Sequence, residues 1–229
     1  NAQTGMVDYK PAHVDFIRSY KPVHVPSEAT IEEAARLINN SVKPFALVGQ
    51  GVELGEAREE LKALLEKAQI PAGCTMLGLS ALPTDHPLNM GMLGMHGNLG
   101  PNVMTNQCDL LIAIGMRFDD RVTGKLETYA KQARIIHFDI DPSEINKNVK
   151  VDVAVVGNCK QTLQRVTELV EPARHQAWVD GFKPYEDKED YKVIQPAIHP
   201  AEGPLLMGEV VRAVSEATAH KAVLVTDVG

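Results

Sequence analysis

Short apolar runs alternate along the chain with longer stretches in which apolar residues recur every three or four positions. Five runs have the length and apolar content of buried strands, at positions 44–48, 70–76, 110–114, 134–140 and 152–157. Helical periodicity fills most of the intervals, at positions 30–40, 53–68, 98–107 and 159–169. Parallel strands need crossover connections, and both faces of their sheet must be covered. The pattern therefore predicts an α/β fold with a doubly wound, parallel, Rossmann-like sheet.

Local signals set the expected ends of these elements. Thr30 and Glu33 have the spacing of a capping box, which predicts that the first helix begins there and ends near Asn39. Residues 78–91 contain two prolines and are predicted to form a loop. An amphipathic pattern at 207–217 predicts one more helix close to the end of the sequence.

The chain divides into four expected parts. We expect residues 1–26 to be a tail or interdomain linker, 27–175 the central domain, 176–203 an exposed linker, and 204–229 the start of a further domain. A strand is expected at 223–225, where the sequence offers it no crossover or partner. We therefore expect the chain to be a piece of a longer polypeptide.

Composition excludes several classes of function. The net charge of -7 argues against a nucleic-acid or anionic membrane partner, since neither would attract the chain. No apolar run approaches the roughly 18 residues that span a bilayer, and no signal peptide is evident, so a cytoplasmic protein is expected. The three cysteines are far apart without paired histidines, which favours small buried thiols over a metal site or disulfides.

Two glycines follow the first predicted strand, in the sequence Gly49-Gln50-Gly51. Glycine lets a backbone come close to an anion at a following helix start, so this turn is a candidate phosphate site. The third glycine of the dinucleotide motif is displaced, because Gly55 stands one residue beyond the expected spacing. A simple tight turn is an equally good interpretation.

Charged residues follow the third and fourth predicted strands, at 110–114 and 134–140. Arg117 and Arg121 bracket two aspartates after the run 110–114, and the planar guanidinium suits a phosphate or a flavin carbonyl. A surface ion-pair cluster is the alternative. Asp139 and Asp141 end the run 134–140, where a carboxylate can accept hydrogen bonds from ribose hydroxyls. Asp141 could equally cap the short helix expected at 142–145.

Apolar and aromatic candidates lie between these segments. Met90, Met92 and Met95 could form an adaptable wall for a flat ring, with core packing as the alternative. His96 lacks a metal-ligand neighbour or a serine partner, which favours ligand contact over catalysis. The chain shows no phosphate-binding P-loop, nucleophile elbow or zinc-protease motif, so no catalytic residue and no metal ligand is predicted.

Three phrases in order along the chain resemble the catalytic large subunit of the acetolactate synthase (acetohydroxyacid synthase) family. They are Gly-Met-Leu-Gly-Met-His-Gly at 91–97, Arg-Phe-Asp-Asp-Arg-Val-Thr-Gly-Lys-Leu at 117–126, and Asp-Ile-Asp-Pro-Ser-Glu-Ile-Asn-Lys-Asn at 139–148. The resemblance implies a thiamine-diphosphate enzyme that condenses two pyruvates, or pyruvate and 2-oxobutyrate, with loss of CO2, for branched-chain amino-acid synthesis. It also implies a central domain that holds FAD without net redox chemistry.

The resemblance further assigns site residues. Gly49 and Gly51 would approach the pyrophosphate, and Arg117 and Arg121 would contact the flavin. The full set of implied cofactor contacts is Gly49, Gly51, Thr75, Met76, Leu77, Met92, Leu93, Gly94, Met95, His96, Gly115, Arg117, Asp120, Arg121, Asp139, Ile140, Glu144, Asp152 and Val153. Gln50 stands where many family members have glycine, and residues 98–101 also depart from the commoner segment.

Thiamine diphosphate and Mg2+ would belong to the full-length enzyme only, since their motifs lie in flanking domains that residues 1–229 lack. The fragment is therefore expected to be inactive. Implied partners are those flanking domains, other copies of the chain, a regulatory small subunit and 2-oxoacid substrates. Two alternatives stay open, a free-standing FAD- or NAD-binding module in electron transfer and a structural domain without a nucleotide.

Overall fold

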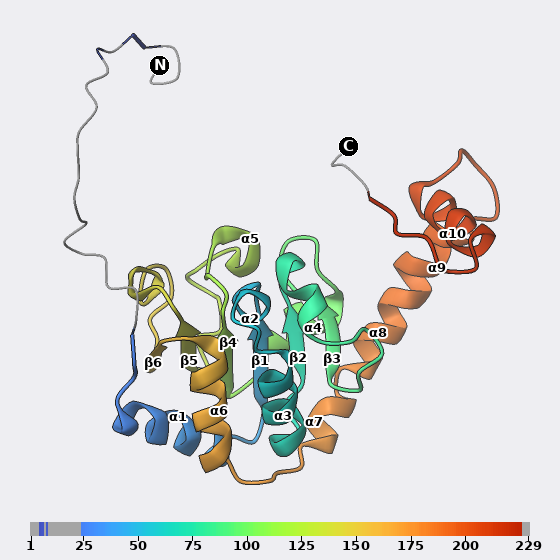
Figure 1. The fold of residues 1–229 in the computed structure, drawn as a ribbon. Helices are drawn as coiled ribbons and strands as arrows, with labels where there is room; N and C mark the ends of the chain where they lie inside the picture. The colour runs from blue at the N-terminus through green and yellow to red at the C-terminus, as the bar shows by residue number, and fades with distance from the viewer. Residues whose placement is uncertain (1–4, 7, 9–23, 226–229) are drawn as a thin grey trace.

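A six-stranded parallel sheet forms the centre of the computed structural model, which describes residues 5–6, 8 and 24–225. The strand order is β3-β2-β1-β4-β5-β6, and every neighbouring pair is parallel (Figure 1). The bounds are β1 Pro44–Val48, β2 Ala72–Cys74, β3 Asn89–Met92, β4 Leu110–Ile114, β5 Arg134–Asp139 and β6 Val153–Val156. The order and the crossovers confirm the predicted doubly wound sheet.

One strand lies where a loop was predicted. β3 begins inside the segment 78–91, extends one residue beyond it, and is an edge strand that pairs with β2 through an irregular register. Its residues Asn89 and Gly91 have low strand propensity, so the local sequence does not show the typical strand signal. The rest of that segment contains a 3-10 helix, η1 (Met76–Ala81).

Helices α1 (Glu28–Asn40), α3 (Arg58–Ala68) and α6 (Cys159–Leu169) cover one face of the sheet (Figure 1). They contribute Ile31, Leu64 and Leu163 to one buried cluster with the sheet residues that face them. Every residue of β1 and of β4 is buried, as expected for strands that are covered on both faces. The predicted helix at 159–169 is confirmed at both ends.

The other face is covered by α4 (Leu99–Thr105), α7 (Gln176–Asp180) and the chain around the start of α8 (Lys183–Glu189). Phe182 packs on Phe45 of β1, with ring centroids 5.3 Å apart, and Trp178 packs edge-on against Phe182. The indole N–H of Trp178 donates a hydrogen bond of 2.8 Å to the carbonyl of Pro44. Residues 176–182 thus pack directly on the sheet.

Two helix starts differ from the predictions. α1 begins at Glu28, and its cap is Ser27, whose side chain accepts from the Thr30 N–H, so the capping-box prediction was wrong. The predicted helix at 53–68 is two helices, α2 (Gly51–Leu54) and α3. Glu56 separates them because it has a left-handed backbone, with φ of 50°.

The C-terminal segment is more helical than predicted. Beyond α8, the expected linker continues through a π-helical turn, η3 (Asp190–Ile194), into α9 (Gln195–Ile198). The predicted amphipathic helix is confirmed as α10 (Met207–Ala217), but residues 223–225 form no strand. In the described part of the chain, no helix is long and apolar enough to cross a membrane. Most of the predicted tail 1–26 lies outside the described residues.

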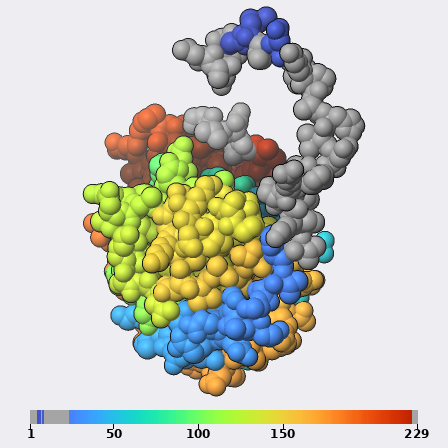
Figure 2. Space-filling model, turned by 90° about the vertical axis from the view of Figure 1, so that its left-hand side faces the viewer, coloured from blue at the N-terminus to red at the C-terminus, as the bar shows by residue number. Residues whose placement is uncertain are grey.

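Short helices lie beyond the carboxyl ends of the strands. Among them are α5 (Asp120–Thr123), which follows β4, and the 3-10 helix η2 (Pro142–Glu144), which follows β5. Figure 2 views the molecule from the β6 edge, where residues coloured yellow, which include the connection from β5 to β6, form the surface above α1 in blue. This connection borders the site described next.

Candidate functional site

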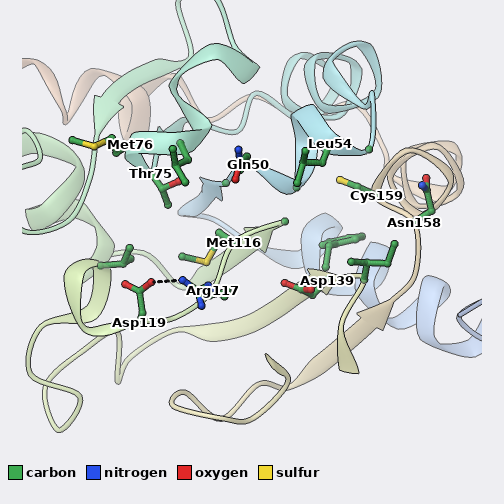
Figure 3. A pocket seen from close by; sticks show the side chains of 18 of the residues that line it. Gln50, Leu54, Thr75, Met76, Met116, Arg117, Asp119, Asp139, Asn158 and Cys159 are labelled. Atoms are coloured by element: carbon green, nitrogen blue, oxygen red, sulfur yellow. Dashed lines mark hydrogen bonds and ion pairs between the residues drawn. The ribbon is translucent and has the colours of Figure 1, made fainter. Parts of the chain in front are cut away.

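A cavity of about 580 Å³ lies at the carboxyl ends of the strands (Figure 3). After β1 the chain continues to β2 and β3 on one side, and after β4 it continues to β5 and β6 on the other. The turns after β1 and β4 therefore diverge and leave a crevice between them, which is where open parallel sheets bind ligands.

The structure brings ten of the predicted site residues together around this cavity. They come from the ends of β1, β2, β4 and β5 and are Gly49, Gly51, Thr75, Met76, Leu77, Gly115, Arg117, Arg121, Asp139 and Ile140. In Figure 3, Thr75 and Gln50 lie on one side of the cavity and Arg117 and Asp139 on the other. Segments that are distant in sequence thus form one site.

The glycines let two strand-end turns touch. A Cβ atom on Gly49 would lie 2.3 Å from the carbonyl oxygen of Gly115, and one on Gly51 would lie 2.6 Å from the Gly115 Cα. The Gly51 N–H also donates to the Gly115 carbonyl, at 2.9 Å. Both glycines are therefore required by backbone contact, and the N–H of Gly51 is already used within the protein.

Other backbone donors remain available at the cavity. Gln50, Met116 and Asn158 each follow a strand and line the cavity, and within the described part of the chain their N–H groups have no acceptor. Unpaired N–H groups at the rim of a cavity are suited to an anionic ligand group. Gln50, where many family members have glycine, can thus offer its backbone N–H to a ligand.

Asp139 is the less exposed of the two acidic residues that line the cavity, Asp119 and Asp139. Its side chain is 10% exposed, and Oδ1 accepts from the Asp141 N–H at 2.8 Å while Oδ2 lies 3.5 Å from the His137 Nε2. A carboxylate oxygen can accept further hydrogen bonds, so Oδ2 can serve a hydroxyl donor in the cavity. Asp141 instead caps η2 by accepting from the Ser143 N–H, and hydrogen bonding from the Ser143 side chain, then from this N–H, lowers the pKa of Asp141.

The two arginines are exposed and weakly paired. Arg117 Nη2 is 3.4 Å from the Asp119 Oδ2, and Arg121 Nε is 4.0 Å from the Asp120 Oδ1. Exposed pairs of this kind contribute roughly 1 kcal/mol or less to stability. Both guanidinium groups can therefore turn to an anionic or carbonyl oxygen of a ligand at little cost.

A smaller hollow of about 330 Å³ adjoins the main cavity and shares Arg121 and Val122 with it. Leu93, Gly94, Met95 and Asp120 line this hollow. The Met95 N–H donates to the Arg121 carbonyl at 2.7 Å, which ties the loop after β3 to the segment after β4. Met92 and His96, on the same loop, line neither hollow, and the His96 side chain is exposed.

Three further predicted residues, Glu144, Asp152 and Val153, also line neither hollow. Glu144 pairs with Lys147 at 2.7 Å, and Asp152 pairs with Arg134 at 2.6 Å. Asp152 and Val153 stand at the beginning of β6, on the opposite edge of the sheet from the cavity. The residues at the carboxyl end of β6 are Asn158 and Cys159, which do line it.

Sequence reasoning missed several lining residues. They are Gln50, Leu54, Gly55, Met116, Asp119, Val122, Phe138, Gly157, Asn158 and Cys159. Asn158 and Cys159 had a usable signal, since they directly follow the predicted strand 152–157. Burial raises the pKa of the Cys159 thiol to about 12, so this side chain is a small neutral part of the wall.

No group of three or more His, Cys, Asp or Glu side chains suited to a metal ion occurs among the residues that the structure describes. All three cysteines are buried free thiols, as predicted. The cavity is thus built from backbone donors, one buried carboxylate, two arginines and apolar side chains. Such a lining suits a ligand that has both anionic and apolar parts.

The fold and the cavity define a doubly wound α/β domain with its ligand site at the switch point of the sheet. The family model described as "Thiamine pyrophosphate enzyme, central domain" matches residues 31–166, and the chain belongs to this family.

Several curated proteins that are similar to the chain are acetolactate synthase large subunits. The acetolactate synthase large subunit of Parasynechococcus marenigrum (strain WH8102) is 42% identical over 209 residues, covering 89% of this chain and 33% of that protein. The acetolactate synthase isozyme 2 large subunit of Escherichia coli (strain K12) is 38% identical, covering 88% and 35%. A probable acetolactate synthase large subunit of Methanocaldococcus jannaschii is 46% identical, covering 72% and 28%. The chain spans about a third of the length of these relatives.

Proposed function

We propose that this chain is the FAD-binding central domain of an acetolactate synthase large subunit. The observation that carries the proposal is the cavity at the switch point, which the largely buried carboxylate of Asp139 and the guanidinium of Arg121 both line. The similarity to acetolactate synthase large subunits over most of the chain supports it.

The residues present fit such a dinucleotide. The N–H groups of Gln50, Met116 and Asn158, which have no acceptor among the described residues, are available to a diphosphate, and Asp139 Oδ2 is available to a ribose hydroxyl. Met76 and Leu77 are each 65% exposed at the cavity, although apolar side chains of this size gain from burial. A flat ring placed on them would remove that apolar surface from water. Bound FAD would supply this ring without net oxidation or reduction.

In the parent enzyme we propose a condensation of two pyruvates, or of pyruvate and 2-oxobutyrate, on thiamine diphosphate with Mg2+. The role of this domain would be to bind and orient its cofactor, because its cavity offers no set of nucleophile and base. Flanking domains would supply thiamine diphosphate, the metal and the catalytic glutamate. Assembly with other copies and with a regulatory small subunit is part of the same proposal. The support is that the similar proteins are acetolactate synthase large subunits and that the chain spans about a third of their length.

The direct test is a titration of the 229-residue chain with FAD, followed by the quenching of flavin fluorescence. We expect binding, and we expect Asp139→Asn and Arg121→Ala each to weaken it by roughly tenfold, since each removes a charged hydrogen-bonding partner. Asp85→Asn and Lys131→Ala, which alter exposed charges outside the cavity, should leave the affinity unchanged.

Absence of FAD binding, or affinity that neither site variant lowers, would contradict the assignment. Preferential binding of NAD, with FAD displaced, would support a different dinucleotide module. Incubation with pyruvate, thiamine diphosphate and Mg2+ should yield no acetolactate, and product formation by the chain alone would overturn the proposed inactivity.

A further inference from the structure

The segment from the last residue of β3 to the N-cap of α4, residues 92–98, which we call the 92–98 loop, is held by two asparagine side chains. Asn98 Oδ1 accepts from the Met92 N–H at 2.8 Å, which closes the loop at its base. Asn102 bonds Gly94 twice, accepting from its N–H at 2.8 Å and donating to its carbonyl at 2.9 Å. The position of Met95, which meets Arg121 at the edge of the cavity, depends on these contacts.

A residue far along the chain completes this arrangement. One carboxylate oxygen of Glu189 accepts from the Leu99 N–H at 3.0 Å and from Asn98 Nδ2 at 3.2 Å. Leu99 is the first residue of α4, so its N–H has no acceptor within the helix. Because Nδ2 of Asn98 points to Glu189, Oδ1 of the same amide is left to face Met92. Glu189 therefore fixes the orientation of the side chain that closes the loop.

Glu189 ends α8 and belongs to a helical arm, residues 183–198, made of α8, η3 and α9. Figure 1 shows the arm running along the β3 side of the sheet toward α10. α8 packs closely on α4, since a Cβ atom on Gly100 would lie 3.7 Å from Phe182 and Tyr185. The π-helical turn begins directly after Glu189, and such turns are less stable than α-helix and frequently mark functional positions.

We propose that Glu189 is a positioning residue that couples the helical arm to the 92–98 loop, so that a ligand at the cavity and the ordered arm stabilise each other. A ligand that contacts Met95 or Arg121 favours the 92–98 loop in the conformation described here. This conformation requires the Asn98 amide in its observed orientation. Glu189 of the arm holds that amide in place. Linkage of this kind is reciprocal. The proposal rests on the proposed function only for the identity of the ligand, FAD.

The test compares Glu189→Leu, which removes the acceptor, with Glu189→Gln, which keeps one. Glu186→Leu is the matched control, because Glu186 lies on the same helix and its described partner is the exposed Lys183, 3.8 Å away. Hydrogen–deuterium exchange of the 229-residue chain is measured with and without FAD, together with FAD affinity.

In free Glu189→Leu we expect faster exchange over residues 92–99 and FAD affinity lowered by roughly tenfold, the effect of losing charge-assisted hydrogen bonds. FAD should protect amides 183–198 in the parent chain, in Glu189→Gln and in Glu186→Leu, and this protection should disappear in Glu189→Leu at saturating FAD. A purely structural role of Glu189 would leave the protection in place.

Unchanged exchange over 92–99 in Glu189→Leu would overturn the contact on which the coupling depends. Binding of FAD by the parent chain without protection of the arm would overturn the coupling and leave the proposed function standing. Absence of FAD binding by the parent chain would contradict the proposed function itself.

Discussion

Three buried thiols make the stability of this domain sensitive to alkaline pH. Burial raises the pKa of Cys74 to about 11 and the pKa values of Cys108 and Cys159 to about 12. In the unfolded chain a thiol titrates near pH 8.5. The folded chain therefore keeps protons that the unfolded chain releases, and the stabilisation is complete below that pH and decreases as pH rises toward 11 to 12.

We expect the free energy of unfolding to fall above about pH 8.5 by about 1.4 kcal/mol per pH unit for each thiol. Urea unfolding between about pH 8 and pH 10 measures this slope. In Cys108→Ala the free energy of unfolding should fall less steeply with pH, because one of the three thiols is gone, whatever the stability of this variant at neutral pH. Ile112→Val, a fully buried control without a titrating group, should be less stable than the parent but have the same slope. Equal slopes in the parent and in Cys108→Ala would contradict this account.

The candidate site could be predicted where the sequence shows where a strand ends. Asp139 and Arg117 follow apolar runs whose ends are clear, and parallel strands bring such ends to one edge of the sheet. Asp152 looks equally suitable in sequence, but it precedes its strand and so lies on the opposite edge. The availability of the Gln50 N–H could not be predicted, because it depends on which neighbouring amides bond to the turn after β4.

The cap of α1 shows how one side chain sets the start of an element. Ser27 Oγ accepts from the Thr30 N–H at 3.2 Å and satisfies a backbone donor that has no acceptor within the helix. Glu33, the other member of the predicted capping box, instead pairs with Arg36 on the exposed surface at 2.6 Å.

Ser27→Ala should therefore lower the free energy of unfolding by about 1 kcal/mol, as the loss of an N-cap does. Glu33→Ala removes only an exposed ion pair and should leave the free energy of unfolding nearly unchanged. Chemical denaturation of both variants and of the parent chain measures these changes in the free energy of unfolding. A larger loss in Glu33→Ala than in Ser27→Ala would restore the capping box as the start of the helix.

Elements with a strong period were predictable and weakly patterned ones were not. α6 has a clear apolar stripe and a cap at Asn158, and both of its ends were predicted. β3 was missed because it is four residues long and includes Asn89 and Gly91, and its pairing with β2 is decided by tertiary contacts. The separation of α2 from α3 depends on the left-handed backbone of Glu56, for which glutamate is not a typical residue.

The C-terminal boundary of the domain formed around the sheet depends on contacts between segments that are far apart in the chain. The boundary predicted at residue 175 rested on the change to a charged, proline-containing composition. Residues 176–182 nevertheless place Trp178 and Phe182 in the buried cluster that also contains Phe45. Residues 176–182 are too few to establish a helical period, which is read over roughly 11–18 residues, so the burial of Trp178 and Phe182 became evident only from the packing of α7 on the sheet.

A chain that ends at residue 199 should therefore keep the stability of the central body, whereas one that ends at residue 175 should lose several kcal/mol. Removing a buried aromatic side chain costs about 3–5 kcal/mol, and the shorter chain loses two, together with the hydrogen bond from Trp178 to Pro44. Urea midpoints of the two truncated chains and the parent measure the difference. Trp178→Ala in the intact chain should reproduce about half of the loss, because Phe182 stays in place. Equal midpoints for the chains ending at 175 and 199 would show that residues 176–182 contribute nothing to the body and that the boundary predicted from composition was right.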